Sequence, residues 1–553
     1  MIEASVERRS SATAAGRSGE RIVMIGLDAM DPGLARRWAD SGDLPVLARL
    51  FGEAAACPID NPYGLFVGAL WVNFASALGP ERHGFHCWNE IPADSYEVRL
   101  RSPMPERYDS FWKRLGDAGL RVAAIDVPHS RAPAALNGIE LVEWGCHDRH
   151  FGLHSQPQAL AGALVEAHGL HPILGFDAYE ARDFAADDKT FRAAYYRTPA
   201  EERALTDATV AGVTAKGELV ESQLGTEAWD FFLAVFGEAH AIGHQQWHLH
   251  DPAHPRFDAA TRATVGRDPI LDVYRAIDRA LGRIMDGLGP ETLLLVHFSH
   301  GMGPHHDGDH LLGEVLRRLD QSRPGASKRP RRPVSRMANL LRALARHLHV
   351  PLGWRLRAAR TLGLNAGSVI ADQAFFQSPN NSVVGGVRLN LAGREPNGVV
   401  RPEAVEGTLA MLEEGLLALV NEATGRPAVL SVTRAETHYA RAPGDRMPDL
   451  FIEWDRSAPI ETVASPRIGR VHIPYRLWRT GDHKPEGLLL ARGAGFAAGS
   501  FLPAVAVEDL GPSIAARLGV PLDDVDGIVS PWLAGEAVRP GSAPALSTAA
   551  APR

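Results

Sequence analysis

Short, continuously apolar segments alternate with amphipathic helical segments along much of the chain. The apolar segments have the length of buried strands; they are RIVMIGL (21–27), RVAAIDVP (121–128), IELVEWG (139–145), WDFFLAVFGEAH (229–240) and TLLLVHFSHG (292–301). Between them lie helical patterns such as 268–288, where apolar residues recur at i, i+3, i+4 and i+7. This alternation predicts an α/β fold with a mostly parallel sheet sandwiched by helices.

Three polar residues lie at or just beyond the ends of these predicted strands. They are Asp28, His240 and His300. In open parallel sheets, ligands bind just past the carboxyl ends of the strands. We therefore expect the functional site at that edge of the sheet.

The α/β domain is predicted to comprise residues 21–316 and 386–536. Residues 1–20 and 537–553 have the composition of disordered tails. Residues 317–385 are predicted to form a basic helical insertion, because no Asp or Glu occurs between Asp320 and Asp372. Within it, 323–360 is either a solvated helical hairpin or a dock for an anionic partner, membrane surface or acidic substrate.

Composition excludes several classes of protein. The net charge is −8 and the isoelectric point about 6.3, so no nucleic-acid binding is expected. The three cysteines are too few and too scattered for a disulfide framework or a zinc ribbon. No apolar run approaches the ~20 residues that span a bilayer, and the first residues lack the apolar core of a secretory signal. We expect a cytoplasmic protein.

Histidines gather in three segments that predict a metal site. In FGEAHAIGHQQWHLHD (236–251), His240 and His244 are four residues apart, a spacing that puts both imidazoles on one helix face. The segment HFSHGMGPHHDGDH (297–310) contains five histidines, including His300. The third, RTGDHKPEGLLLARG (479–493), contains His483 ahead of an apolar strand.

The chain resembles the alkaline phosphatase superfamily, in particular its type I phosphodiesterase/nucleotide pyrophosphatase branch. The resemblance runs from Arg21 to about Gly535 and rests on seven segments in the family order. They are IGLDAMDP (25–32), WVNFASALGPERHGF (71–85), FGEAHAIGHQQW (236–247), FSHGMGP (298–304), VRLNLAGREPNGVV (387–400), MPDLFIEW (447–454) and GDHKPEG (481–487). The family has an α/β sheet sandwiched by helices, in agreement with the fold predicted from the residues.

The resemblance implies two divalent metal ions, usually zinc. One would be held by His240, His244 and His483, where His240 stands in place of a family Asp. The other set falls on Asp28, Ser299 and His300, with Ser299 in place of a second family Asp.

The position of the family's Thr or Ser nucleophile falls on Val67, which cannot attack a substrate. No Ser or Thr occurs between Pro62 and Phe74, and Tyr63 is the sole hydroxyl there. The chain therefore departs from the family pattern at its nucleophile as well as at two metal ligands.

These departures predict an altered metal chemistry. Three neutral imidazoles bind Zn²⁺ well and leave a fourth position for water, which can act as a nucleophile without a serine. At the second site only Asp28 and His300 are good ligands, while Ser299 is a weak one that could contact substrate. We expect one tight metal, most simply Zn²⁺, and a second that is weak or absent.

Three further charged residues are candidates for the site. Glu238 could act as a general base, orient an imidazole, or form a surface salt bridge. Arg388 and Arg394 could clamp a phosphate, or could serve in structural salt bridges.

The leading hypothesis for function is a metal-dependent hydrolase of phosphate or sulfate esters that acts on a small anionic substrate through a metal-bound water. One alternative is a mononuclear three-histidine metalloenzyme of another reaction type. The other is a non-catalytic relative that acts as a binding protein.

Overall fold

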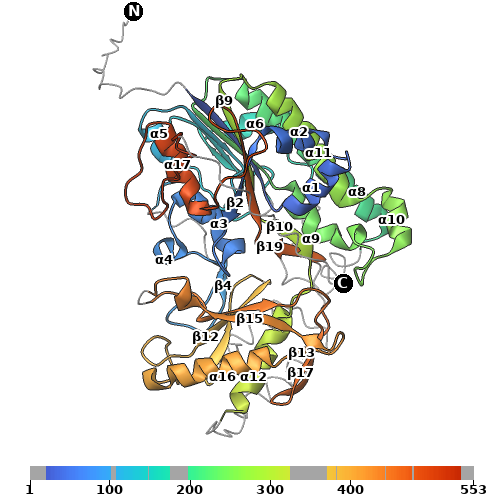
Figure 1. The fold of residues 1–553 in the computed structure, drawn as a ribbon, viewed down its shortest axis with the longest axis vertical. Helices are drawn as coiled ribbons and strands as arrows, with labels where there is room; N and C mark the ends of the chain where they lie inside the picture. Colours follow the sequence, from blue (N-terminus) through green and yellow to red (C-terminus); the bar gives the residue numbers. More distant parts are fainter. Residues whose placement is uncertain are drawn as a thin grey trace, which may run out of the picture.

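The structure is a computed structural model that describes residues 20–100, 108–146, 149–174, 197–323, 370–381, 383–441, 444–475 and 479–536. A larger α/β part lies above a smaller part that also contains both helices and strands (Figure 1). The predicted tails, apart from Glu20, lie outside the described residues, as does most of the predicted basic insertion. The anionic partner expected at 323–360 therefore stays a prediction.

The larger part is built on a nine-stranded sheet with the strand order β21-β2-β20-β9-β1-β8-β5-β6-β7. Its centre is parallel and consists of β9 (Thr292–Phe298), β1 (Arg21–Leu27), β8 (Phe231–Phe236), β5 (Val122–Ile125) and β6 (Gly138–Val142). Toward the edges, β20 (Gly487–Arg492) runs antiparallel to both β9 and β2 (Ala55–Asp60), and β7 (His154–Gln156) runs antiparallel to β6. The edge strand β21 (Val505–Ala506) is parallel to β2.

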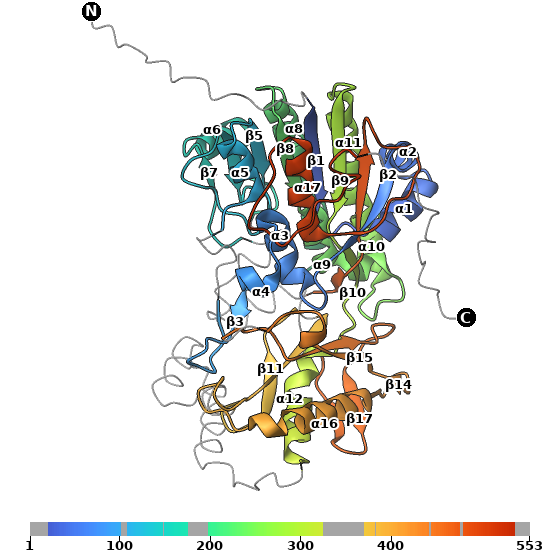
Figure 2. The same cartoon turned by 60° about the vertical axis from the view of Figure 1, so that its left-hand side comes forward.

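Helices pack on both faces of this sheet (Figure 2). One apolar core joins alternate residues of β1, such as Val23 and Ile25, to the helices α1 (Pro32–Asp40), α2 (Pro45–Glu53), α6 (Leu160–His168), α8 (Pro199–Leu224), α9 (Glu238–His250) and α11 (Pro269–Asp286). The other core joins Ile22 and Met24 to α3 (Phe66–Ser76), α5 (Phe111–Asp117) and α17 (Leu510–Arg517). Because the strands are apolar on both faces, the sheet is buried between two helical layers. The predicted α/β fold is confirmed.

Sequence signals at the helix starts explain where several helices begin. Asp31 caps α1 by accepting from the backbone N–H of Leu34, and Pro32 follows at the first helical position. At α8, Thr198 and Glu201 form a capping box. Asp268 caps α11, again with a proline next.

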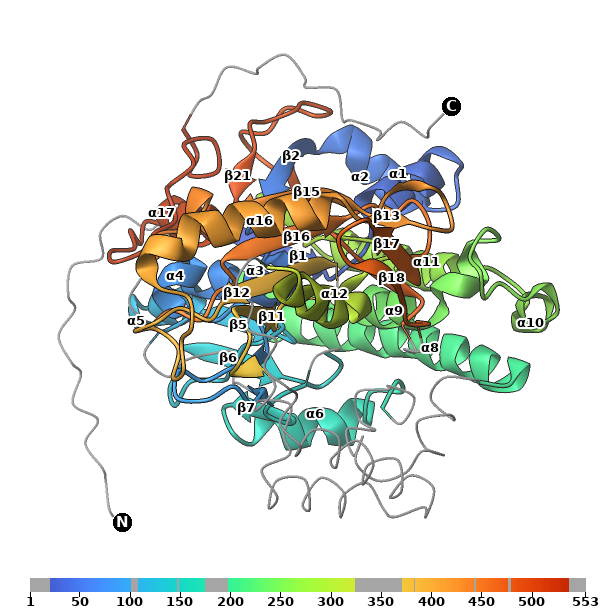
Figure 3. The same cartoon turned by 90° about the horizontal axis from the view of Figure 1, so that it is seen from below.

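The smaller part holds two antiparallel four-stranded sheets. The first has the order β11 (Phe375–Ser378), β12 (Val384–Leu389), β16 (Leu450–Trp454), β15 (Val429–Arg434). The second has the order β14 (Arg426–Pro427), β13 (Val420–Asn421), β17 (Thr462–Ser465), β18 (Gly469–His472). The helices α12 (Asp309–Gln321) and α16 (Val405–Leu417) share one apolar core with these sheets; both helices lie in the foreground when the molecule is seen from below (Figure 3).

These elements differ from the boundaries predicted for the basic insertion. The first boundary, at residue 317, falls inside α12, and the second, at 385, falls inside β12. Residues 386–474, assigned from sequence to the α/β domain, lie largely in the smaller part. The prediction followed the basic composition of 317–385, whereas apolar residues at both of its ends pack into the core of the smaller part.

Several short elements complete the described chain. The two-stranded ribbons are β10 (Gly301–Pro304) with β19 (Gly481–Lys484), and β3 (Asn89–Glu90) with β4 (Arg99–Leu100). Short helices occur at α4 (Pro80–His83), α10 (Ala259–Val265), Pro402–Ala404, Ala435–Thr437 and Val507–Asp509. Within the described ranges, no helix combines the length and the apolar character needed to cross a membrane. The cytoplasmic location stays a prediction.

Candidate metal centre at the carboxyl edge of the sheet

The candidate site lies where three neighbouring parallel strands end. Asp28 follows β1, α9 begins two residues after β8, and Ser299 and His300 follow β9. His483 lies on β19, which pairs with β10 just beyond His300. In Figure 1 the elements α9, β10 and β19 lie together at the end of the sheet that faces the smaller part.

Three imidazoles converge at this edge. The Nε2 atoms of His240 and His244 are 3.0 Å apart, and those of His244 and His483 are 3.1 Å apart. All three side chains are buried, and their ligand atoms form one of two groups among the described residues that could hold a metal ion. For comparison, Zn–N bonds of about 2.0–2.1 Å in a tetrahedral site put ligand nitrogens about 3.3 Å apart. The sequence-predicted triad is therefore assembled.

The hydrogen bonds of the other ring nitrogens fix the tautomers of two of these rings. His240 Nδ1 lies 2.6 Å from the Asp28 carboxylate, and His244 Nδ1 lies 2.8 Å from the carbonyl oxygen of Gly481. A carboxylate and a carbonyl accept only, so Nδ1 carries the proton in each ring. In the neutral rings both Nε2 atoms then present lone pairs toward each other. A cation between them resolves that repulsion.

His483 completes the set with a third neutral nitrogen. Burial, together with the nearby rings of His300, His244 and His240, holds the pKa of His483 well below its usual range. Glycines permit the close approach of α9 and β19 that brings this ring in. A Cβ on Gly481 would lie 2.3 Å from the carbonyl oxygen of Gly243, and one on Gly243 would lie 2.9 Å from the Met302 side chain.

Asp28 orients a histidine in this structure, and both of its carboxylate oxygens accept hydrogen bonds from other side chains. Its Oδ2 accepts from His240, while its Oδ1 accepts from Trp71 Nε1 at 2.9 Å and from the Ser299 hydroxyl at 3.1 Å. Burial raises the pKa of Asp28, but His240 and His300 outweigh burial, and the pKa lies below its usual range. A buried carboxylate that holds a ligating imidazole in this way sets its tautomer and orientation.

Ser299 is likewise committed within the protein. Besides donating to Asp28, its hydroxyl oxygen accepts from the backbone N–H of Ala29 at 3.1 Å. The side chain is fully buried. Its contacts thus join the ends of β1 and β9, and the substrate contact predicted for it stays a prediction.

His300 adjoins the three-histidine group without belonging to it. Its ring centroid lies 4.4 Å from that of His483, 5.9 Å from that of His240 and 6.1 Å from that of Phe66. Neither His300 nor Asp28 belongs to any candidate metal group found among the described residues. The second, weaker metal set predicted from sequence, Asp28 with Ser299 and His300, stays a prediction.

Glu238 contacts a buried lysine and a fourth histidine, neither of which belongs to the three-histidine group. Its Oε1 lies 2.9 Å from His171 Nε2 and 3.4 Å from Lys216 Nζ. Burial raises the pKa of Glu238, but Lys216 and His171 outweigh burial, so its pKa is lowered. A carboxylate with a lowered pKa and no exposure is poorly suited to act as a general base.

The position of the missing nucleophile is apolar in space as well as in sequence. Val67 is the second residue of α3 and packs in a buried apolar cluster with Leu65, Val383 and other residues. The hydroxyl of Tyr63 lies 3.0 Å from the Thr433 hydroxyl in the smaller part. Neither residue provides a nucleophile at the histidine centre.

Arg388 and Arg394 are not brought to the histidine centre. Arg388 donates to Glu395 and to the carbonyl oxygens of Met447 and Asp445. Arg394 donates to Asp449 and Glu395. Both guanidinium groups hold loops of the smaller part together, which is the structural alternative considered for them.

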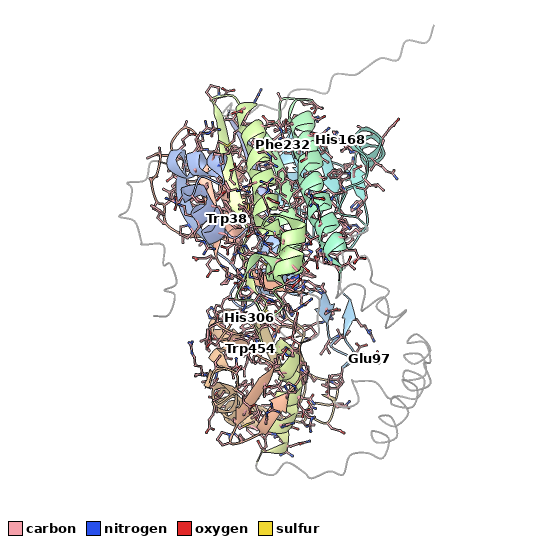
Figure 4. The ribbon with its side chains drawn as sticks, turned by 90° about the vertical axis from the view of Figure 1, so that its right-hand side faces the viewer. Trp38, Glu97, His168, Phe232, His306 and Trp454 are labelled. Atoms are coloured by element: carbon pink, nitrogen blue, oxygen red, sulfur yellow. The ribbon has the colours of Figure 1, made fainter. Side chains whose placement is uncertain are left out.

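A second buried group of metal-ligand type contains His305, Asp307 and Asp482. His305 Nδ1 lies 2.7 Å from Asp482, and His305 Nε2 lies 3.0 Å from Asp307. Burial lowers the pKa of His305, but the two carboxylates outweigh burial and raise it to about 9. An imidazolium placed between two carboxylates offsets one of their two negative charges, so this group has the geometry of an ion bridge. Figure 4 shows the neighbouring His306 near Trp454, at the junction of the two parts.

The fold and the site define an α/β protein with a candidate three-histidine metal centre at the carboxyl edge of a mostly parallel sheet. The chain belongs to the type I phosphodiesterase/nucleotide pyrophosphatase family, whose model matches residues 22–474. The resemblance seen in the sequence is thereby confirmed, and membership supports a phosphoester hydrolase.

Solved structures with a similar course of the chain include two named hydrolytic enzymes. Murine ectonucleotide pyrophosphatase/phosphodiesterase 5 is 11% identical, with 93% of this chain and 98% of that chain covered and a TM-score of 0.48. Phosphonoacetate hydrolase from Sinorhizobium meliloti 1021, in complex with phosphonoacetate, is 16% identical, with 89% and 94% covered and a TM-score of 0.42. No curated protein sequence matches the chain.

Proposed function

We propose that this protein is a metal-dependent hydrolase of small anionic phosphate or sulfate esters, with a single divalent cation, most simply Zn²⁺, on His240, His244 and His483. One observation carries the proposal: three buried ring nitrogens converge, and the partners of two rings leave their Nε2 lone pairs facing each other. Membership in a phosphodiesterase family supports the ester substrate.

The donor set fits a zinc ion by its chemistry. Neutral imidazoles are favoured zinc ligands, and three of them leave one position open in a tetrahedral site. When bound, the ion would activate a water molecule and offset negative charge on the ester. A set of three neutral ligands leaves the ion's full charge uncompensated by its ligands, which favours an anionic substrate.

The residues of the chain supply orientation and an apolar wall. Asp28 and the Gly481 carbonyl hold the imidazoles of His240 and His244 in the tautomer whose Nε2 atom carries the lone pair that a metal ion requires. Phe66, at the start of α3, lies beside His300 and presents an apolar ring. Because Val67 has no nucleophilic atom, it cannot form the covalent intermediate that the family's Thr or Ser would form, and water would take the role of the nucleophile.

Turnover measured on a panel of phosphate and sulfate mono- and diesters tests the proposal. The protein reconstituted with zinc is compared with the His240→Ala/His244→Ala double variant, and hydrolysis by the wild type alone is the expected result. A zinc-loaded wild type that hydrolyses none of the esters would overturn ester hydrolysis and favour the other reaction type considered for a three-histidine centre.

A further inference from the structure

The helix that carries two of the three histidines is fastened to a neighbouring helix by a buried ion pair. Lys216 of α8 is fully buried, and its Nζ lies 3.4 Å from Glu238 at the first position of α9. The same ammonium lies 2.8 Å from Asp126 and donates to the carbonyl oxygens of Gly145 and Val235. Asp126 and Val235 belong to the ends of β5 and β8, so Lys216 joins α9 to the edge of the sheet.

His171 contacts the same oxygen of the Glu238 carboxylate. The backbone N–H of Ile173 donates to His171 Nδ1, so in the neutral ring Nε2 carries the proton and donates to Glu238. The ring fits between two glycines: a Cβ on Gly145 or on Gly212 would lie 2.4 Å from it. The space around Glu238 is thus shaped for one imidazole and one ammonium.

A second set of polar contacts holds α9 near its C-terminal end. Gln246 departs from helical geometry inside α9, with φ −128° and ψ 18°. Its amide donates to the carbonyl oxygen of Glu202 at 2.7 Å and to the Glu202 carboxylate at 2.6 Å, and it accepts from Thr206 at 2.8 Å. All of these groups are buried, and both partners lie on α8.

The two contacts enclose the histidine pair. Glu238 precedes His240 by two residues, and Gln246 follows His244 by two residues. In a helix with 3.6 residues per turn, fixing both ends sets the rotation of the faces between them. A rotation of α9 would move both Nε2 atoms relative to His483, which lies on a separate element.

We propose that Lys216 and Gln246 are positioning residues for the metal centre. Lys216 acts through Glu238, and Gln246 acts through Glu202 and Thr206, so that α8 holds His240 and His244 in the geometry that a cation requires. The inference rests on the proposed metal centre, and it adds residues that touch neither the cation nor the substrate.

Zinc affinity and the visible spectrum of the cobalt-loaded protein test this inference, because the spectrum reports ligand geometry directly. The variants are Lys216→Met/Glu238→Gln, which replaces the ion pair with neutral groups of similar size, and Gln246→Met. The matched control is Glu20→Gln/Arg517→Met, which removes a partly buried, two-bond ion pair at the opposite edge of the same sheet. Each is measured in the full-length protein by competition with a chromophoric chelator.

We expect both α9 variants to lose zinc affinity by roughly 10- to 100-fold and to change the cobalt spectrum, because outer contacts of metal ligands have effects of that size. The control keeps the wild-type affinity and spectrum. Folded α9 variants with wild-type affinity and an unchanged spectrum would overturn the inference alone. If the double variant does not fold, Gln246→Met and the single Glu238→Gln decide in the same way. A wild type that binds neither metal would overturn the proposed function itself.

Discussion

Replacement of Asp28 by Asn tests how the buried carboxylate prepares the histidine centre. The two side chains have nearly the same shape, but the amide has one acceptor atom where the carboxylate has two. In the wild type, one oxygen accepts from His240 and the other from Trp71 and Ser299. The amide can satisfy one of these sides and presents an N–H₂ group to the other.

Both orientations of the amide carry a cost that the structure allows us to work out. If the amide nitrogen faces His240, it donates to Nδ1, and the neutral ring must adopt the other tautomer. The ring proton then lies on Nε2, the atom needed for the metal. If it faces Trp71 Nε1, a buried indole N–H loses its acceptor, at about 1–3 kcal/mol. A cost of about 1.4–2.7 kcal/mol corresponds to a 10- to 100-fold loss of zinc affinity, which is the range measured for such outer contacts.

Competition with a chromophoric chelator at neutral pH measures this loss. Asp278→Asn is the matched control, because Asp278 is also a buried carboxylate that accepts two hydrogen bonds. Its donors are the backbone N–H groups of Val46 and Leu47, and it contacts none of the three histidines by a hydrogen bond described for it. We expect that control to lose stability and keep its zinc affinity. An Asp28→Asn protein that binds zinc as tightly as the wild type would refute the assignment of Asp28 as the group that orients His240.

Three further outcomes follow from the contacts described. His300→Ala keeps its bound zinc in elemental analysis, because His300 lies outside the three-nitrogen group; loss of the metal would include it among the ligands. The raised pKa of His305 stabilises the folded state fully below about pH 6.5, and this stabilisation is lost as the pH rises through about 9. Urea unfolding across that window should therefore show a decline that His305→Gln lacks, and equal declines would contradict the bridge with Asp307 and Asp482. Arg394→Ala breaks a partly buried ion pair with Asp449 and lowers the free energy of unfolding by about 1–3 kcal/mol without changing zinc affinity; a stability equal to that of the wild type would contradict the structural role of this arginine.

The sheet, and the position of the candidate site at its carboxyl edge, could be predicted from sequence because both depend on local patterns. Strands buried on both faces must be continuously apolar, as in TLLLVHF of β9, and loops at their carboxyl ends then meet at one edge. The i, i+4 pair His240 and His244 is likewise local, since one helix determines their common face.

The roles of individual polar residues could not be predicted, because they depend on partners distant in sequence. Asp28 is predicted from sequence as a metal ligand, whereas its hydrogen bonds to His240, Trp71 and Ser299 are found only in the structure. The sequence leaves Glu238 as a base, an orienting group or a surface charge, and its partner Lys216, a buried residue of α8, is found only in the structure.

The smaller part was the least predictable region of the described chain. Its strands are short, and in its first sheet β12 pairs with β16, from which it is separated by a long stretch of chain. Composition drew attention to the basic segment, while the apolar residues at its margins determine the packing. The contact of His305 with Asp482 could not be predicted for a similar reason, since the two residues are 177 positions apart.

The metal content of the purified protein tests the central claim most directly. Elemental analysis of the wild type is compared with that of the His240→Ala/His244→Ala double variant, with His305→Ala as a control from the ion bridge. We expect a single equivalent of zinc in the wild type and in the control, and none in the double variant. A wild type that retains no metal after exposure to zinc, or a double variant that retains the full amount, would contradict the three-histidine centre.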